Sequence, residues 1–99
     1  MLRHRMLAVY LNDMKTLYFI KDIRENEFYW RYRIDEGFTK EIKEATSFES
    51  EEEALKEFQQ DYLEELFTNR LIEIVKVYSL NGLYDGSRVC VRRLINEKL

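Results

Sequence analysis

Carboxylate side chains crowd the middle of this chain and are its first candidates for chemistry. Residues 41–65 hold 10 Asp and Glu against 2 Lys and Arg. Residues 1–40 have 6 against 8, and residues 66–99 have 3 against 6, so the net charge of −3 conceals an acidic centre between two basic ends. Carboxylates act as general acid and base, or hold a divalent cation, only where they converge in a cleft. We expect these to spread along an exposed helix face instead.

The strongest functional pattern is a ridge of acidic residues at helical spacing. Side chains four residues apart lie on one helix face, so Glu53, Glu57, Asp61 and Glu64 or Glu65 form a line of negative charge. Such a ridge complements a basic surface on another protein, including one whose groove holds nucleic acid. The partner-binding set is therefore Glu53, Glu57, Asp61, Glu64 and Glu65. A solvated face without any partner is the ordinary alternative.

An aromatic and basic stripe offers the competing interpretation. In the segment Glu27 to Asp35, one alternating set is Phe28, Trp30, Tyr32 and Ile34. If that set faces the helix, Tyr29, Arg31 and Arg33 face outward, with Lys21 of the neighbouring strand beside them. Proteins that bind single-stranded nucleic acid combine stacking aromatics with arginines in this way. Nucleic acid is therefore the alternative partner, and pairing with nearby carboxylates is the ordinary explanation.

Catalytic and cofactor motifs are missing from the sequence. His4 is the single histidine and Cys90 the single cysteine, so no nucleophile pair or zinc ligand set is indicated. The 3 glycines are placed at turns, and no phosphate-cradling loop is present. We therefore expect no enzyme, no cofactor and no metal. Cys90 lies between Val89 and Val91 in a predicted strand and is expected to be buried or half-buried.

Length and composition indicate one small domain, residues 1–99. The chain is 45% hydrophobic and 14% aromatic without proline, which excludes disorder. Its longest apolar run, Met6 to Leu11, is far shorter than the ~20 residues of a membrane helix. We expect a cytoplasmic protein, in a bacterial cell or an infected host. Domains of this size are marginally stable, so a homodimer is an open alternative. Residues 1–13 are interpreted as an N-terminal extension, mobile or helical, of that domain.

Periodicity predicts an α+β fold of the order β-β-β-α-β-β. The expected strands are Thr16 to Ile23, Glu27 to Asp35, Phe38 to Phe48 at an edge, Leu71 to Leu80 in the centre and Ser87 to Ile95. Turns are expected at Gly37, Asn81-Gly82 and Asp85-Gly86.

A capping box from Ser50 to Glu53 predicts the start of an amphipathic helix over about residues 51–68. Its apolar stripe is Leu55, Phe58, Tyr62 and Leu66, widened by Ala54, Leu63 and Phe67. The expected architecture is an antiparallel sheet of about four to five strands with this one helix packed on one face. Residues 2–12 fit either a helix or a short strand, so the N-terminal element is left open.

Two short runs resemble part of a known small module. The segments Phe28-Tyr29-Trp30-Arg31-Tyr32 and Thr46 to Ala54 resemble the YegP-type module, with an aromatic strand, a second strand and a Ser-led helix. Asp35-Glu36-Gly37 stands where that module has an Asn-Gly turn. In style the chain also resembles the small acidic proteins of bacteriophages, many of which bind and inhibit host proteins. The favoured hypothesis is a protein-binding regulator or inhibitor encoded by a phage or mobile element. A nucleic-acid-binding domain is the second hypothesis, and a self-associating structural protein the third.

Overall fold

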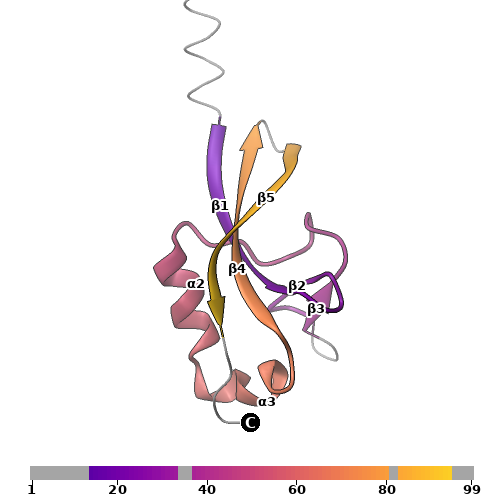
Figure 1. The fold of residues 1–99 in the computed structure, drawn as a ribbon, viewed down its shortest axis with the longest axis vertical. Helices are drawn as coiled ribbons and strands as arrows, with labels where there is room; N and C mark the ends of the chain where they lie inside the picture. Colours follow the sequence, from indigo (N-terminus) through magenta and orange to yellow (C-terminus); the bar gives the residue numbers. More distant parts are fainter. Residues whose placement is uncertain (1–13, 34–36, 81–82, 95–99) are drawn as a thin grey trace, which may run out of the picture.

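A five-stranded antiparallel sheet with helices on one side forms the domain (Figure 1). The structure is a computed structural model that describes residues 14–33, 37–80 and 83–94. The sheet order is β3-β2-β1-β4-β5, which confirms the predicted α+β class. The elements are β1 (Met14–Asp22), β2 (Glu27–Tyr29), β3 (Phe38–Thr39), α2 (Glu51–Phe58), η1 (Asp61–Leu63), α3 (Glu64–Phe67), β4 (Ile72–Leu80) and β5 (Leu83–Leu94).

The central strands β1 and β4 pair along their whole length. Their register runs from Met14 opposite Leu80 to Asp22 opposite Ile72 without a shift. β4 also pairs with β5, so the predicted central position of this apolar strand is confirmed. A strand with neighbours on both sides and apolar residues in succession is buried on both faces.

Two hydrophobic clusters therefore form, one on each face of the sheet. On the helix side, Ile20 and Ile74 pack with Ala54 of α2 and Phe67 of α3. On the opposite side, Phe19, Phe28, Val75 and Val77 form a smaller cluster covered by Leu17, Ile42, Ala45 and Tyr84. Burial of both faces explains why β1 and β4 carry apolar residues at odd and even positions alike.

The second predicted strand is much shorter than expected. β2 ends at Tyr29, because the chain turns there and returns at Gly37. Trp30 N–H donates to the Gly37 carbonyl at 2.8 Å, and Gly37 N–H donates to the Arg33 carbonyl at 3.0 Å. Gly37 has a φ of +68°, a conformation that glycine adopts without strain, so the predicted turn at Gly37 is confirmed. Of the alternating set, Ile34 lies outside the described residues.

The third strand is also shorter, but its edge position is confirmed. β3 contains two residues, and the chain then turns around Ile42 instead of continuing to Phe48. Phe48 forms only an isolated bridge with Tyr18 of β1. The two backbone hydrogen bonds of that bridge, each 2.8 Å, hold the segment that leads into α2 against the sheet.

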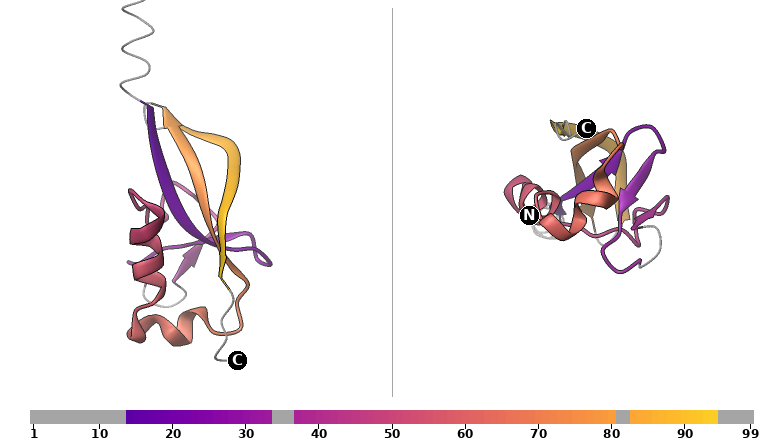
Figure 2. Two further views of the ribbon diagram at one scale, coloured as in Figure 1. Left: turned by 60° about the vertical axis from the view of Figure 1, so that its left-hand side comes forward. Right: turned by 90° about the horizontal axis from the view of Figure 1, so that it is seen from below.

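The predicted helix over residues 51–68 is broken after Phe58. Its start is as expected, because the Ser50 hydroxyl accepts a hydrogen bond from Glu53 N–H at 3.1 Å. The Glu53 carboxylate accepts from Glu49 N–H at 3.2 Å, one residue before the expected partner. Gln60 is extended, with φ −67° and ψ 131°, and the chain then turns into η1 and α3 (Figure 2). The single predicted helix is therefore two short helices joined by a 3-10 turn.

The last strand is longer than predicted and starts earlier. β5 begins at Leu83 and runs through Asp85-Gly86, where the sequence predicted a turn. Tyr84 pairs with Ser79 and Arg88 with Val77, so three residues of β5 lie opposite one residue of β4. This register shift accommodates the Asp-Gly pair as a bulge within the strand. The predicted turn at Asn81-Gly82, the end of the strand at Ile95, and the prediction for residues 1–13 all lie outside the described residues.

One end of the sheet projects beyond the rest of the domain. β1, β4 and β5 extend past α2 and past the short β2–β3 hairpin, as both views show (Figures 1 and 2). We call this part the arm, defined as residues 14–18, 76–80 and 83–89. No helix in the described part of the chain is long and apolar enough to span a membrane.

Candidate functional site

The predicted acidic ridge does not run along one helix. Glu53 lies in the first turn of α2, whereas Asp61 follows the break and Glu64 and Glu65 begin α3. The break after Phe58 changes the direction of the chain, so the i, i+4 spacing no longer aligns these side chains. Four of the five remain exposed. The exception is Glu57, whose side chain is only 13% exposed.

Glu57 is bound by two groups of the same chain. Its Oε2 accepts a hydrogen bond from the Tyr29 hydroxyl at 2.7 Å and another from Arg31 Nε, also at 2.7 Å. The guanidinium and the carboxylate form an ion pair through the second contact. This cluster joins α2 to the end of β2, and it removes Glu57 from the exposed part of the predicted ridge. We call Tyr29, Arg31 and Glu57 the Glu57 cluster.

Each member of the Glu57 cluster has a shifted pKa. Burial raises the pKa of Glu57, but the hydrogen bonds from Arg31 and Tyr29 outweigh it and leave the pKa below its ordinary value. Burial and the hydrogen bond to Glu57 raise the pKa of Tyr29. The hydrogen bond to Glu57 also raises the pKa of Arg31. All three shifts favour an ionised Glu57 that accepts hydrogen bonds from a neutral Tyr29 and a cationic Arg31, an arrangement that holds α2 to the end of β2.

The predicted nucleic-acid surface is not assembled. The expectation that Tyr29 faces outward is wrong, because Tyr29 is buried in the helix-side cluster, in contact with Phe67. Arg31 is bound to Glu57, and Arg33 Nη1 donates to the Phe38 carbonyl at 2.9 Å. Lys21 Nζ lies 5.9 Å from the ring centroid of Phe28, on the other side of the sheet. The four side chains therefore share no common face.

Alternation failed here because both faces of β2 are covered. Phe28 and Tyr29 point to opposite sides of the sheet, and both are buried. The prediction from alternation required one face of the strand to be buried and the other to be exposed to solvent. Tyr32, expected beside Phe28, is exposed in the turn that follows the strand.

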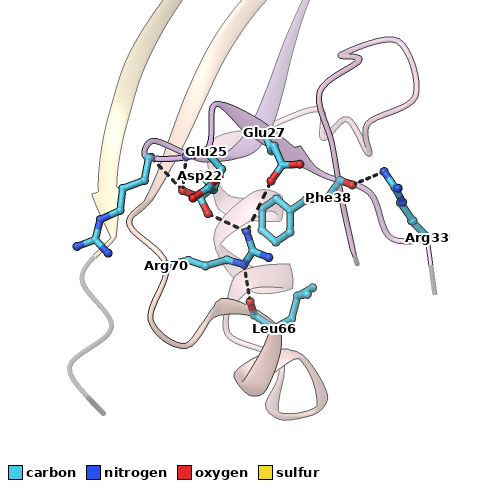
Figure 3. Close-up of polar contacts among 8 residues, drawn as sticks. Asp22, Glu25, Glu27, Arg33, Phe38, Leu66 and Arg70 are labelled. Atoms are coloured by element: carbon cyan, nitrogen blue, oxygen red, sulfur yellow. Dashed lines mark hydrogen bonds and ion pairs between the residues drawn. The ribbon is translucent and has the colours of Figure 1, made fainter. Parts of the chain in front are cut away.

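A second polar cluster, unpredicted from the sequence, connects the β1–β2 turn to the segment before β4 (Figure 3). The buried Asp22 carboxylate accepts hydrogen bonds from the N–H groups of Arg24 and Glu25 at 3.0 and 3.2 Å. Arg70 Nη1 donates to the other Asp22 oxygen at 2.8 Å, and Arg70 Nε donates to the Leu66 carbonyl at 3.1 Å. We call Asp22 and Arg70 the Asp22–Arg70 pair.

The Arg70 guanidinium has further contacts with the sheet. Its guanidinium lies 4.0 Å from the ring centroid of Phe38, and Nη1 is also 4.0 Å from Glu27. An open polar hollow of about 430 Å³ lies beside it, lined by Asp22, Arg24, Glu25, Glu27, Thr68, Asn69 and Arg70. Because Asp22 and Arg70 contact each other, the backbone, and the Glu27 and Phe38 side chains of the same sheet, we assign this cluster to the fold. Asp22 and Arg70 are 48 residues apart in sequence, so no spacing pattern points to the pair.

The turn formed by η1 and α3 exposes an aromatic side chain next to acidic residues in the sequence. Tyr62 was predicted on the buried stripe but is 73% exposed, which corrects that expectation. The break after Phe58 rotates the chain so that Leu63 and Phe67 enter the core in its place. Acidic side chains surround the exposed ring in sequence. We call this surface the acidic turn, defined as Asp61, Tyr62, Glu64 and Glu65.

Cys90 is exposed, so the prediction of a buried or half-buried thiol is wrong. It lies on β5 at the sheet edge, where no further strand covers it in the described part of the chain. Partial burial of the sulfur raises the pKa of the thiol, and the nearby Glu73 carboxylate raises it further.

We therefore expect Cys90 to react in the folded protein, but slowly. Iodoacetamide should modify the native chain fully, at a rate at neutral pH below that of an unstructured cysteine peptide, because less thiolate is present. The rate should rise as the pH approaches and passes the ordinary thiol pKa of 9.0. Mass spectrometry of the intact chain measures this, with Cys90→Ser as the unreactive control. Protection until the protein unfolds would contradict the exposed position.

No group of three His, Cys, Asp or Glu side chains within residues 14–33, 37–80 and 83–94 is arranged to hold a metal ion. A scan against protein-family models and searches of curated proteins and of solved structures found no match to this chain. The basis for a function is therefore the surface of the chain itself.

Proposed function

We propose that this protein acts by binding another macromolecule, and that the acidic turn is its docking surface. The partner is a protein with a basic surface, and the chain serves as a regulator or inhibitor of that protein, of the kind that phages and mobile elements encode. We place it in the cytoplasm of a bacterial cell or an infected host. Binding, without a chemical step, is the activity proposed.

The exposed ring of Tyr62 is the observation that carries this proposal. Tyrosine is among the residue types that dominate binding energy at protein interfaces, because its ring buries a large area and its hydroxyl still forms a hydrogen bond. Here the ring is 73% exposed, directly beside Asp61 and two residues before Glu64. Protein interfaces commonly have aromatic residues at their centre and polar or charged residues at their rim, and Tyr62 with its acidic neighbours in sequence has that composition.

Core packing anchors the acidic turn, and an anchored backbone lowers the entropic cost of binding. Leu63 and Phe67 follow Tyr62 in the sequence by one and five residues, and both are buried. Phe67 packs against the rings of Tyr29, Phe38 and Phe58. A partner would therefore meet a surface whose backbone is already ordered.

The charge of the acidic turn defines the chemistry of its partner. Asp61, Glu64 and Glu65 lie within five residues, and no Lys or Arg lies between them in sequence. This charge attracts Lys and Arg on the partner and excludes acidic surfaces. An arginine can also stack on the Tyr62 ring. A basic groove, including one that otherwise holds nucleic acid, is the surface that fits.

Affinity capture with charge-reversal variants tests the proposal. Immobilised wild-type protein should retain one stoichiometric protein from a lysate of its native host. Asp61→Lys combined with Glu65→Lys should lose that protein, because the reversal repels a basic partner. Glu44→Lys combined with Glu25→Lys is the matched control, since both residues are exposed and lie elsewhere.

The control must retain the partner, and both double variants must give the circular dichroism of the folded chain. If the acidic-turn variant and the control lose the partner protein equally, the loss is caused by the change in net charge, and a localised docking surface is contradicted. Retention by the acidic-turn variant would contradict the proposal outright.

A further inference from the structure

The arm carries a surface of exposed apolar side chains. Seven large hydrophobic side chains are exposed among the residues that the structure describes, and two of them are the separate tyrosines Tyr32 and Tyr62. The other five all belong to the arm. We call them the arm patch: Met14, Tyr78, Leu80, Leu83 and Val89.

The five residues lie on one face of the sheet. Met14 and Leu83 are both directly opposite Leu80, on its two neighbouring strands, so these three side chains point the same way. Two-residue alternation along β4 places Leu80 and Tyr78 on the side of Ile74, which packs under the helices.

Val89 completes the surface from the third strand. It lies opposite Lys76, which is on the same side of β4 by the same alternation. The arm patch therefore continues the helix-side face of the sheet beyond the N-terminal end of α2, where no described element covers it (Figure 2).

Charged groups are scarce on this face of the arm. Lys76 is the one charged side chain among those described there, and its Nζ lies 5.6 Å from the centroid of the Tyr78 ring. Interfaces between identical subunits have this composition, with an apolar centre from which charged residues are depleted. This face therefore offers little charge complementarity to a strongly charged partner.

We propose that a second copy of this chain covers the arm patch, so that the protein is a dimer through stacked arms. The five residues leave on the order of 400 Å² of surface in water, which is the size of the largest apolar patch on a typical monomer, and such patches are often functional. A standard interface buries about 800 Å² on each partner. The arm patch supplies the apolar centre of such an interface, and neighbouring side chains such as Thr16 supply its rim.

Two-fold symmetry accounts for the details of this surface. An axis through the middle of the arm patch brings identical residues into reciprocal contact and stacks the two sheets face to face. In this antiparallel stack, the end of one arm that carries Lys76 and Val89 lies against the end of the other arm that carries Leu80 and Leu83. The two Lys76 side chains then lie apart instead of opposing each other. This contact uses the face of the sheet and differs from pairing along the β5 edge.

Light scattering on the full chain tests the dimer. Wild-type protein should show twice the 12.2 kDa chain mass at high concentration and should dissociate on dilution. Leu83→Glu should weaken dimerisation by about a hundredfold, because it places an unpaired carboxylate in the apolar centre. Leu83 is 69% exposed, so the substitution leaves the fold of one chain intact. Val89→Lys is a second variant on another part of the same face and should act in the same way.

Tyr32→Glu is the matched control, because Tyr32 is a similarly exposed hydrophobic residue that belongs to the turn after β2 and not to the arm. It should remain dimeric, and every variant should keep the circular dichroism of the wild type. A wild-type mass of one chain at every concentration would overturn the proposal. That result is expected if residues 1–13 of the same chain cover the arm patch, and also if nothing covers it. A dimer that survives both arm variants would also overturn it and would place the contact elsewhere, such as the β5 edge. The acidic turn takes no part in this test, so its outcome is independent of the proposed function.

Discussion

Replacing Arg70 with alanine should lower the free energy of unfolding by about 3–4 kcal/mol, because it leaves a buried carboxylate without its cation. Asp22 is 2% exposed and its partner guanidinium lies 2.8 Å away. The substitution also removes the hydrogen bond to the Leu66 carbonyl and the stacking on Phe38. Urea denaturation followed by circular dichroism measures the difference.

Arg24→Ala is the control for this prediction. Arg24 binds Asp22 through its backbone N–H, and its side chain is exposed, so the change should cost within about 0.5 kcal/mol. Arg70→Lys should fall between the two, since lysine keeps the charge but lacks the planar fork that contacts Asp22 and Leu66 together. A loss below about 1 kcal/mol for Arg70→Ala would show that the Asp22–Arg70 pair does not hold these segments together.

Replacing Glu57 with alanine should cost about 2–3 kcal/mol, because hydrogen bonds to a charged group contribute more than neutral ones. The variant leaves the buried Tyr29 hydroxyl without its acceptor and Arg31 without its anion. Glu52→Ala is the matched control, one of the exposed glutamates on the same helix, and should cost a few tenths of a kcal/mol at most. Equal losses for the two variants would contradict an internal role for Glu57.

The same cluster predicts a dependence on pH. The folded-state pKa of Glu57 lies below its ordinary value of 4.5, so its contribution is fully present above that value and is lost as the pH falls through the lowered pKa. Between about pH 6 and pH 3, wild-type protein should therefore lose more stability than Glu57→Gln, which does not titrate. Urea midpoints across that range measure both slopes, and parallel slopes would contradict the prediction.

Local signals in the sequence predict the regular elements well. The Ser50 hydroxyl and the glutamates after it identify the start of α2 because capping depends on neighbours in sequence. The β-branched and other apolar residues that dominate 71–80, on both alternating faces, identify β4 for the same reason. The class of the fold follows from the order of such elements.

The break in the helix has no local signal. No proline or glycine lies between Phe58 and Leu63, and the apolar spacing continues through Tyr62. The break occurs where tertiary packing favours Leu63 and Phe67 in the core over Tyr62. Such a preference depends on residues of β2 and β3, which lie far away in the chain.

The candidate surfaces were mispredicted for an electrostatic reason. The sequence indicates an acidic ridge and a basic stripe as separate surfaces, but opposite charges in one small domain attract each other. Arg31 of the stripe and Glu57 of the ridge are bound together at 2.7 Å. A contact between residues 26 positions apart cannot be read from periodicity. The broken helix exposes Tyr62 of the acidic turn, which is the docking surface that we propose.

Calorimetric titration of the captured partner into wild-type protein and Tyr62→Ala is the most direct test of the acidic turn as the docking surface. We expect Tyr62→Ala to weaken binding by at least tenfold, because the Tyr62 ring is the central contact of the proposed docking surface. Tyr62 is 73% exposed, so the same substitution should leave the urea midpoint unchanged. Equal affinity of Tyr62→Ala and wild-type protein for the partner would contradict the proposal that the acidic turn is the docking surface.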